Sequence, residues 1–183
     1  MFDFENQIII GTILGGSSLV KPPKGKNYYL SMRGQNENWL KYKMAEMPSL
    51  FQKNSVRLYG KTYRANSSCS KSLSKIKKSL YDENRRIISM EILDRLRDIG
   101  LAVWYLDGGS KTGRERKNAY INTTKFGKDG SQIIQKYFSE VGMNCTINKD
   151  GERTKVLFSV EGTEVLFKTI AHRFPSFMYY KLK

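Results

Sequence analysis

The sequence is poor in the residues that build metal centres and disulfide scaffolds. It has one histidine, His172, and two cysteines, Cys69 and Cys145, among 183 residues. A single histidine excludes a His-based catalytic triad and a multi-histidine metal site. Two distant cysteines outside any CxxC pattern argue against a disulfide framework or a structural zinc site. This cysteine usage predicts a cytoplasmic or organellar-matrix protein rather than a secreted one.

Long apolar runs are also missing. No stretch approaches the roughly 20 residues that a membrane-spanning helix needs, and the chain does not open with the layout of a signal peptide. The apolar run at residues 8–14 is too short, and the acidic residues Asp3 and Glu5 precede it. We therefore expect no membrane-embedded segment.

Acidic residues are scarce relative to basic ones, with 17 Asp and Glu against 32 Lys and Arg, a formal net charge of +15. A surplus of this size indicates a polyanionic partner, either nucleic acid or an anionic membrane surface. The chain is 39% hydrophobic and 12% aromatic. That content supplies a core and excludes wholesale disorder.

The order of predicted elements repeats along the chain. Each half reads as a buried helix ending in a glycine pair, a strand pair, a helix, a hairpin and a last helix. In the first half these are residues 3–14, 17–32, 36–51, 55–66 and 70–81. In the second they are 89–106, a strand at 120–124 after the glycine pair, 128–141, 145–160 and 162–173. We expect the helical stretch 89–106 to break near Gly100, and an Asp150-Gly151 turn to close the last hairpin. The pattern predicts an α/β (α+β) protein with two repeats, 1–86 and 87–183.

Four segments carry a resemblance to a known family. They are Leu-Gly-Gly-Ser-Ser-Leu at 14–19, Leu-Ala-Val-Trp-Tyr-Leu-Asp-Gly-Gly-Ser at 101–110, Ile-Asn-Thr-Thr-Lys-Phe at 121–126, and Phe-Pro-Ser-Phe-Met-Tyr-Tyr-Lys-Leu at 174–182. The chain resembles the single-chain, two-repeat LAGLIDADG homing endonucleases. The resemblance implies two pseudo-symmetric αββαββα repeats with their signature helices at the interface. Each repeat would contribute a curved antiparallel sheet to a DNA-binding surface, and small residues such as Gly11 and Ala102 would let the two helices approach closely.

The chain departs from the family at the catalytic positions. The family carries one metal-binding aspartate at the end of each signature helix, and those positions align with Gly16 and Gly108. The resemblance places Mg²⁺ at Gly15, Gly16, Asp107 and Gly108, but glycine offers only its carbonyl oxygen. Asp107 stands one position early and would ligate only after a shift of register. We predict lost cleavage, and the pattern leaves open whether the loss is natural or deliberate.

Two further residues align with the family's catalytic neighbourhood. Gln35 resembles the polar residue kept near the scissile phosphates, and Lys125 occupies a comparable place in the second half, where a basic group would organise solvent. The alternative for each is a surface residue that makes one phosphate contact.

Basic and aromatic residues of the predicted strands and loops are the candidate DNA contacts. They are Arg33, Arg57, Tyr59, Lys61, Tyr63, Arg64, Lys111, Arg114, Arg116, Lys117, Lys149, Arg153 and Lys155. Period-two spacing predicts that the four from Arg57 to Tyr63 share one face, with Val56, Leu58 and Thr62 turned to the core. The alternatives are an ordinary solvated sheet face and, for residues 111–117, a basic loop. The pair Arg85-Arg86 is expected in a solvated linker.

The sequence thus predicts a monomer that binds a long, asymmetric double-stranded DNA target. An intron maturase that binds intron RNA stays open as the alternative, because a basic surface suits either polyanion.

Overall fold

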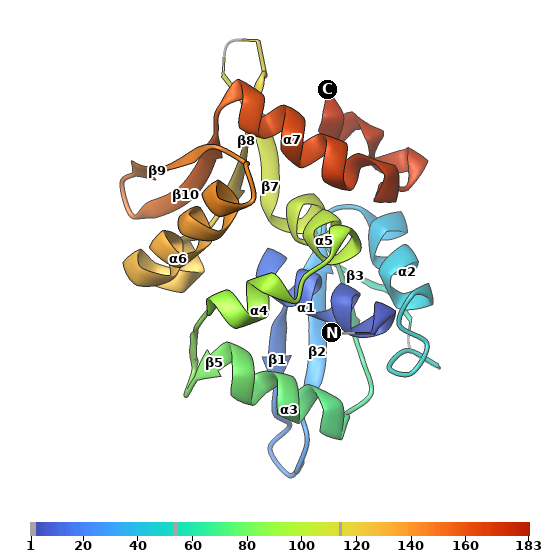
Figure 1. The fold of residues 1–183 in the computed structure, drawn as a ribbon. Helices are drawn as coiled ribbons and strands as arrows, with labels where there is room; N and C mark the ends of the chain where they lie inside the picture. The colour runs from blue at the N-terminus through green and yellow to red at the C-terminus, as the bar shows by residue number, and fades with distance from the viewer. Residues whose placement is uncertain (1–2, 53–54, 114) are drawn as a thin grey trace.

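The computed structural model describes residues 3–52, 55–113 and 115–183. Two four-stranded antiparallel sheets lie on either side of a central pair of helices (Figure 1). The first repeat contains α1 (Phe4–Gly15), β1 (Ser18–Val20), β2 (Tyr29–Gly34), α2 (Glu37–Ala45), β3 (Arg57–Tyr59), β4 (Thr62–Asn66) and α3 (Lys71–Leu80). The second contains α5 (Asp98–Gly108), β7 (Gly109–Thr112), β8 (Asn118–Asn122), α6 (Gly127–Glu140), β9 (Cys145–Asp150), β10 (Arg153–Phe158) and α7 (Val160–Ile170).

The predicted αββαββα repeats are confirmed. The sheet orders are β1-β2-β4-β3 and β7-β8-β10-β9, so the two halves have the same topology. Between them run the short hairpin β5 (Tyr81–Asp82) and β6 (Arg85–Arg86) and the helix α4 (Met90–Asp94). The remaining elements are the 3-10 helices η1 (Thr124–Phe126), η2 (Ala171–Arg173) and η3 (Ser176–Leu182).

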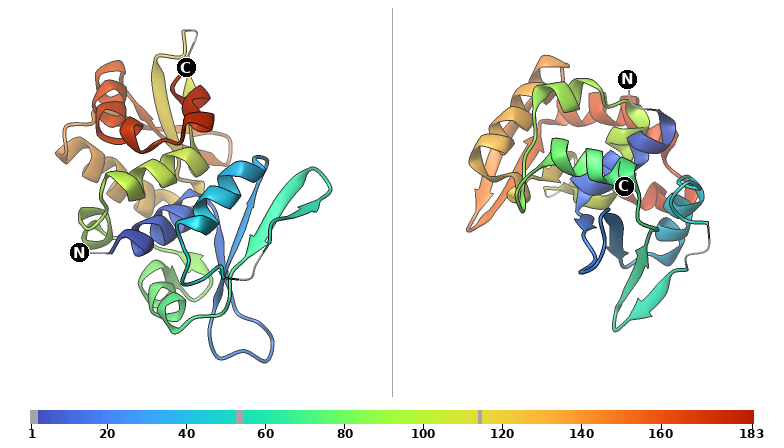
Figure 2. Two further views of the ribbon diagram at one scale, coloured as in Figure 1. Left: turned by 90° about the vertical axis from the view of Figure 1, so that its right-hand side faces the viewer. Right: turned by 90° about the horizontal axis from the view of Figure 1, so that it is seen from below.

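The central helices α1 and α5 are apolar on most faces, and they pack directly against each other (Figures 1 and 2). A Cβ atom at Gly11 would overlap the carbonyl oxygen of Gly100, so the two backbones touch at this pair of glycines. Ala102 is fully buried. The expectation that small residues allow the close approach is therefore confirmed, with Gly100 as the partner of Gly11.

The predicted helix break near Gly100 is wrong, since Gly100 lies inside α5 and the break falls between Asp94 and Asp98. Gln7 of α1 stabilises this break. Its buried amide donates to the carbonyl of Arg95 and accepts from the backbone N–H of Arg97, both at 2.9 Å. Because that amide satisfies the orphan backbone groups at the start of α5, the chain reverses there without a glycine.

Buried aromatic side chains join the elements of each half. Trp39, Trp104, Tyr105 and Phe138 are all buried, and the centres of the Trp104 and Phe138 rings lie 5.8 Å apart. The predicted helix 36–51 ends early, at Ala45, and α7 begins at Val160 because Ser159 caps it. No helix in the described part of the chain is long and apolar enough to cross a membrane.

The C-terminal segment returns from the second repeat to the first. Phe177 packs edge-on against Tyr42 of α2, and the Asn36 amide lies 3.5 Å from the sulfur of Met178. The last residues of the chain are therefore placed beside the ends of the central helices.

Candidate nucleic-acid interface

The ends of the two central helices meet. A Cβ atom at Gly108 would lie 3.2 Å from the carbonyl oxygen of Gly15, and Gly16 has a φ of 141°, a conformation that favours glycine. A hollow of about 170 Å³ opens beside them, lined by Gly15, Gly16, Ser17, Arg33, Asp107 and Lys125. The structure therefore brings Gly16, Asp107 and Lys125 together. Gln35 lies elsewhere, in an open hollow with Tyr63 and Tyr180.

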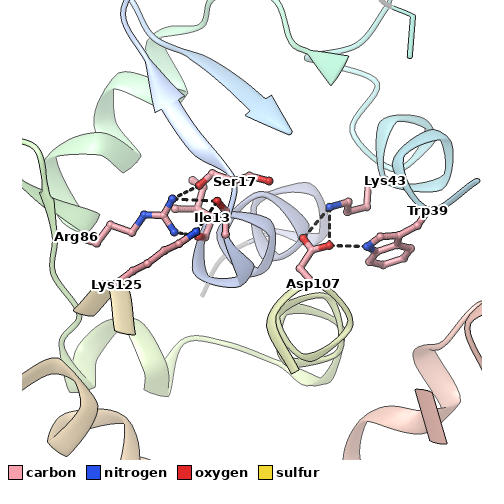
Figure 3. Close-up of polar contacts among 8 residues, drawn as sticks. Ile13, Ser17, Trp39, Lys43, Arg86, Asp107 and Lys125 are labelled. Atoms are coloured by element: carbon pink, nitrogen blue, oxygen red, sulfur yellow. Dashed lines mark hydrogen bonds and ion pairs between the residues drawn. The ribbon is translucent and has the colours of Figure 1, made fainter. Parts of the chain in front are cut away.

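Asp107 is held by the helix α2 and not left free to bind a ligand. Its carboxylate accepts hydrogen bonds from the Lys43 ammonium, at 2.7 and 2.9 Å, and from the Trp39 indole N–H, at 2.5 Å (Figure 3). The Lys43 side chain is 1% exposed and that of Asp107 is 13% exposed. Trp39 and Lys43 are four residues apart on one face of α2, so both can donate hydrogen bonds to the same carboxylate. Asp107 thus anchors α2 to α5.

The residues at the helix ends do not fit a divalent metal. Mg²⁺ prefers several hard oxygen ligands, and carboxylates usually supply them. Gly16 and Gly108 have no side chain, and the Asp107 oxygens are already paired with Lys43 and Trp39. Within residues 3–52, 55–113 and 115–183, no three His, Cys, Asp or Glu side chains lie close enough to hold a metal ion.

Cations occupy the end of α1 instead. The guanidinium of Arg86 donates to the carbonyl of Ile13 at 2.7 Å and to those of Gly16 and Ser17, and Lys125 donates to the Gly16 carbonyl at 3.0 Å (Figure 3). Helix C-termini attract cations because their last carbonyls lack partners. The prediction of a solvated Arg86 is wrong, because the β5–β6 hairpin turns this side chain inward and leaves it 8% exposed.

Lys125 lies in a positive environment. Partial burial lowers the pKa of Lys125 below its usual range, and the neighbouring Arg86 and Arg33 lower it further, while Asp107 opposes them. The other helix end has a lysine too: Lys181 donates to the Gly109 carbonyl at 2.8 Å, and burial lowers its pKa. Lys181 belongs to the C-terminal segment 174–182 that carries part of the family resemblance, but the sequence predicted no role for it.

A row of three arginines crosses the first sheet. Arg33 of β2 lies opposite Arg64 of β4, which in turn lies opposite Arg57 of β3. All three are exposed, and Arg64 stacks over the Tyr59 ring at 5.0 Å. Like charges directly opposite each other destabilise a sheet, so this row is costly to the folded protein unless an anion covers it.

A hollow of about 450 Å³ lies over this row, and no acidic residue of the described part of the chain lines it. Its lining consists of Tyr29, Ser31, Ser55, Arg57, Tyr59, Arg64 and Asn66. The β3–β4 hairpin that carries two of the arginines projects from the body of the protein (Figure 2). The surface is therefore open to a large partner.

The equivalent row of the second sheet is less charged. There Lys155 of β10 lies between Asn122 of β8 and Asn148 of β9, and its ammonium sits 4.9 Å from the centre of the Tyr120 ring. Arg153 is exposed on the same face, two residues before Lys155. Equivalent positions of the two sheets thus carry different side chains, three arginines in the first sheet and a lysine between two asparagines in the second.

The predicted common face of Arg57, Tyr59, Lys61 and Tyr63 is wrong for Tyr63. Gly60 and Lys61 form the turn, and the register pairs Tyr59 with Thr62 and Leu58 with Tyr63. Tyr63 therefore lies on the opposite face, partly buried against the core, and Thr62 shares the face of Tyr59. Leu58 was expected in the core, yet it is 61% exposed, because the hairpin extends beyond the helices.

Two lysines predicted as DNA contacts lie on the other side of the second sheet. Lys111 pairs with buried Ala119 in the register, and its ammonium donates to the Leu182 carbonyl at 2.9 Å. Lys149 pairs with Thr154 and so faces away from Lys155. The strand register, which fixes the face of each side chain, decided both placements.

The loop after β7 remains exposed. Arg116 has a positive φ of 50°, and Lys117 forms an ion pair with Glu115 at 2.5 Å. Arg114 lies outside the described residues.

These features agree with the comparisons with known proteins. The sequence matches the LAGLIDADG DNA endonuclease family over residues 6–169, and the chain belongs to that family. No curated protein matches the sequence.

Several solved structures share the fold. The homing endonuclease I-WcaI bound to its DNA recognition sequence has a TM-score of 0.87 and 19% identity, covering 98% of this chain and 86% of its own. I-DmoI in complex with DNA and Mn has a TM-score of 0.65 and 16% identity, covering 91% and 95%. Full-length DUF199/WhiA from Thermatoga maritima has a TM-score of 0.59 and 15% identity, and the match covers 98% of this chain and 60% of that one. Other I-DmoI complexes were determined with Mg or with Ca.

Proposed function

We propose that this protein binds a specific double-stranded DNA sequence and does not cut it. The observation that carries the proposal is the arginine row Arg33–Arg64–Arg57, which lies on an open sheet face beside helix ends that lack catalytic carboxylates. Fold similarity to proteins solved on their DNA targets supports the DNA-binding part. Mg²⁺, which the family uses, is not expected to be held here.

The two sheets carry different side chains, and this difference supports an asymmetric DNA target. Arginine reads guanine through two hydrogen bonds in the major groove, and asparagine reads adenine in the same way. The row on the first sheet therefore favours guanine in its half of the target, while Asn122 and Asn148 favour adenine in the other half. We propose that residues 1–86 and 87–183 each contact one half-site, and that one monomer covers both.

Selection of binding sites from random duplex DNA tests the function. We expect one enriched, asymmetric sequence, and Arg64→Ala is expected to weaken binding to it by about 1–3 kcal/mol and to relax preference at one position. Lys78→Ala, an exposed lysine of α3, is the matched control and should reduce affinity only slightly for every sequence. Equal enrichment of all sequences would contradict specific binding.

The second sheet offers a matched pair of lysines on opposite faces. We expect Lys155→Ala to weaken DNA binding about tenfold, whereas Lys149→Ala should change it less than twofold. Fluorescence anisotropy with the selected duplex at fixed salt measures both. If Lys149→Ala has the larger effect, the DNA binds the face of the second sheet opposite to the one that we propose.

Intron RNA is the competing partner. Competition between the selected duplex and structured intron RNA at matched salt distinguishes the two, because affinity for any polyanion depends on salt. Displacement of the duplex by RNA at lower concentration would favour a maturase.

A further inference from the structure

The cations at the end of α1 gather in one hollow. Its volume is about 620 Å³, and the charged residues in its lining, as far as the structure describes the chain, are all basic: Arg33, Arg64, Arg85, Arg86 and Lys125. Ser31 and Arg64 also line the hollow over the arginine row, so the two hollows form one continuous surface. A DNA duplex that covers the sheet would therefore also place a phosphate at the end of α1.

The roles of these cations differ. The Arg86 guanidinium donates hydrogen bonds to the carbonyls of Ile13, Gly16 and Ser17 and to the Ser18 hydroxyl, and it lies 5.8 Å from the centre of the Tyr81 ring, so this residue serves the structure of the helix end. Lys125 has three N–H donors, and among the described residues its ammonium donates one hydrogen bond, to the Gly16 carbonyl. That single bond holds the ammonium in place and leaves two donors for a ligand.

Lys125 lies beside the position at which the family carries a catalytic carboxylate. A Cβ atom at Gly16 would lie only 3.2 Å from the Lys125 ammonium nitrogen. In this chain the ammonium therefore occupies the space into which an aspartate side chain would extend.

We propose that Lys125 and Arg33 bind one backbone phosphate of the DNA directly, with no bridging divalent cation. This inference rests on the proposed DNA binding and adds the ligand of the helix-end hollow. Phosphate suits the site because its oxygens accept several charge-assisted hydrogen bonds, and Arg and Lys are its usual partners. Bound phosphate would also offset the mutual repulsion of Arg33, Arg86 and Lys125.

Three measurements on the full chain test the proposal. Binding of the selected duplex should be equal within about twofold in EDTA and in Mg²⁺ at matched ionic strength. Lys125→Met and Arg33→Ala should each weaken binding about tenfold and reduce the slope of log affinity against log salt by about one. Lys78→Met is the control. Mn²⁺ titrated into the protein alone should show no saturable binding by electron paramagnetic resonance.

Single methylphosphonate substitutions along the duplex locate the phosphate. One neutralised position should weaken binding by the unaltered protein, and it should weaken binding by Lys125→Met less, because only Arg33 still contacts that phosphate in the variant. Arg33 is exposed, so its variant tests the site even if Lys125→Met unfolds. Saturable Mn²⁺ binding, or duplex binding that needs Mg²⁺, would overturn the proposal. So would an unchanged salt slope in both variants while specific binding persists. Loss of all duplex binding by the unaltered protein would overturn the proposed function itself.

Discussion

Introduction of aspartate at both helix ends, Gly16→Asp with Gly108→Asp, is expected to turn a protein that leaves DNA intact into a Mg²⁺-dependent nuclease. Carboxylates there would supply the hard ligands that the site lacks, and the metal would activate water and neutralise charge on the scissile phosphate. Each single variant should at most nick one strand. The measurement is cleavage of the selected duplex by the four proteins in Mg²⁺ or EDTA.

The backbone makes this gain costly. Gly16 has a φ of 141°, so aspartate there should cost about 1–3 kcal/mol of stability. A Cβ at Gly108 would lie 3.2 Å from the Gly15 carbonyl oxygen, so the neighbouring backbone must shift slightly to admit the second aspartate. Gly16→Asn with Gly108→Asn is the matched control, because it has the same shape and strain without charge. Full cutting by the unaltered chain would mean that the catalytic positions lie elsewhere. A double Asp variant that binds normally without cutting would show that further parts of the nuclease site are lost.

Removal of the charge on Asp107 should destabilise the fold more than any other single change considered. Asp107→Asn leaves the Lys43 ammonium, which is 1% exposed, without its counter-charge, and breaking a buried pair from one side costs about 3–5 kcal/mol. Denaturant unfolding of the variant measures this. The double variant Lys43→Met with Asp107→Leu should regain most of the loss, since it removes both charges.

The exposed ion pair between Glu37 and Lys41 on the same helix α2 is the control. Its side chains are 38% and 58% exposed, so Glu37→Gln should cost less than about 1 kcal/mol. An Asp107→Asn loss as small as that would show that the carboxylate is not a structural anchor.

Local patterns were sufficient for the central helices and the hairpins. The apolar stretches that end in glycine pairs predicted α1 and α5, because a helix that is apolar on most faces must be buried. Gly60 and Gly151 both lie in hairpin turns, although the last turn consists of Gly151 and Glu152, one residue beyond the predicted Asp150-Gly151 pair. The repeated order of these signals, together with the family resemblance, predicted two similar halves.

Which strand residues face the partner could not be predicted as securely, because one residue in a turn reverses every later side chain. Counting by two through Gly60 and Lys61 placed Tyr63 beside Tyr59, whereas the register placed it on the opposite face. The arginine row is a product of the same register. Arg33 is remote in sequence from Arg57 and Arg64, and only strand pairing aligns the three.

By itself the sequence determined the positive charge, the buried helices and the absence of aspartate at Gly16 and Gly108, since each is a property of residue identity and local spacing. The tertiary structure alone decided what replaced the carboxylates. Arg86 and Lys125 reach the end of α1 from segments distant in sequence, and Lys43 of α2 forms an ion pair with Asp107 of α5. These contacts depend on how far-apart elements pack, and a helix C-terminus attracts whichever cation the packing brings within reach.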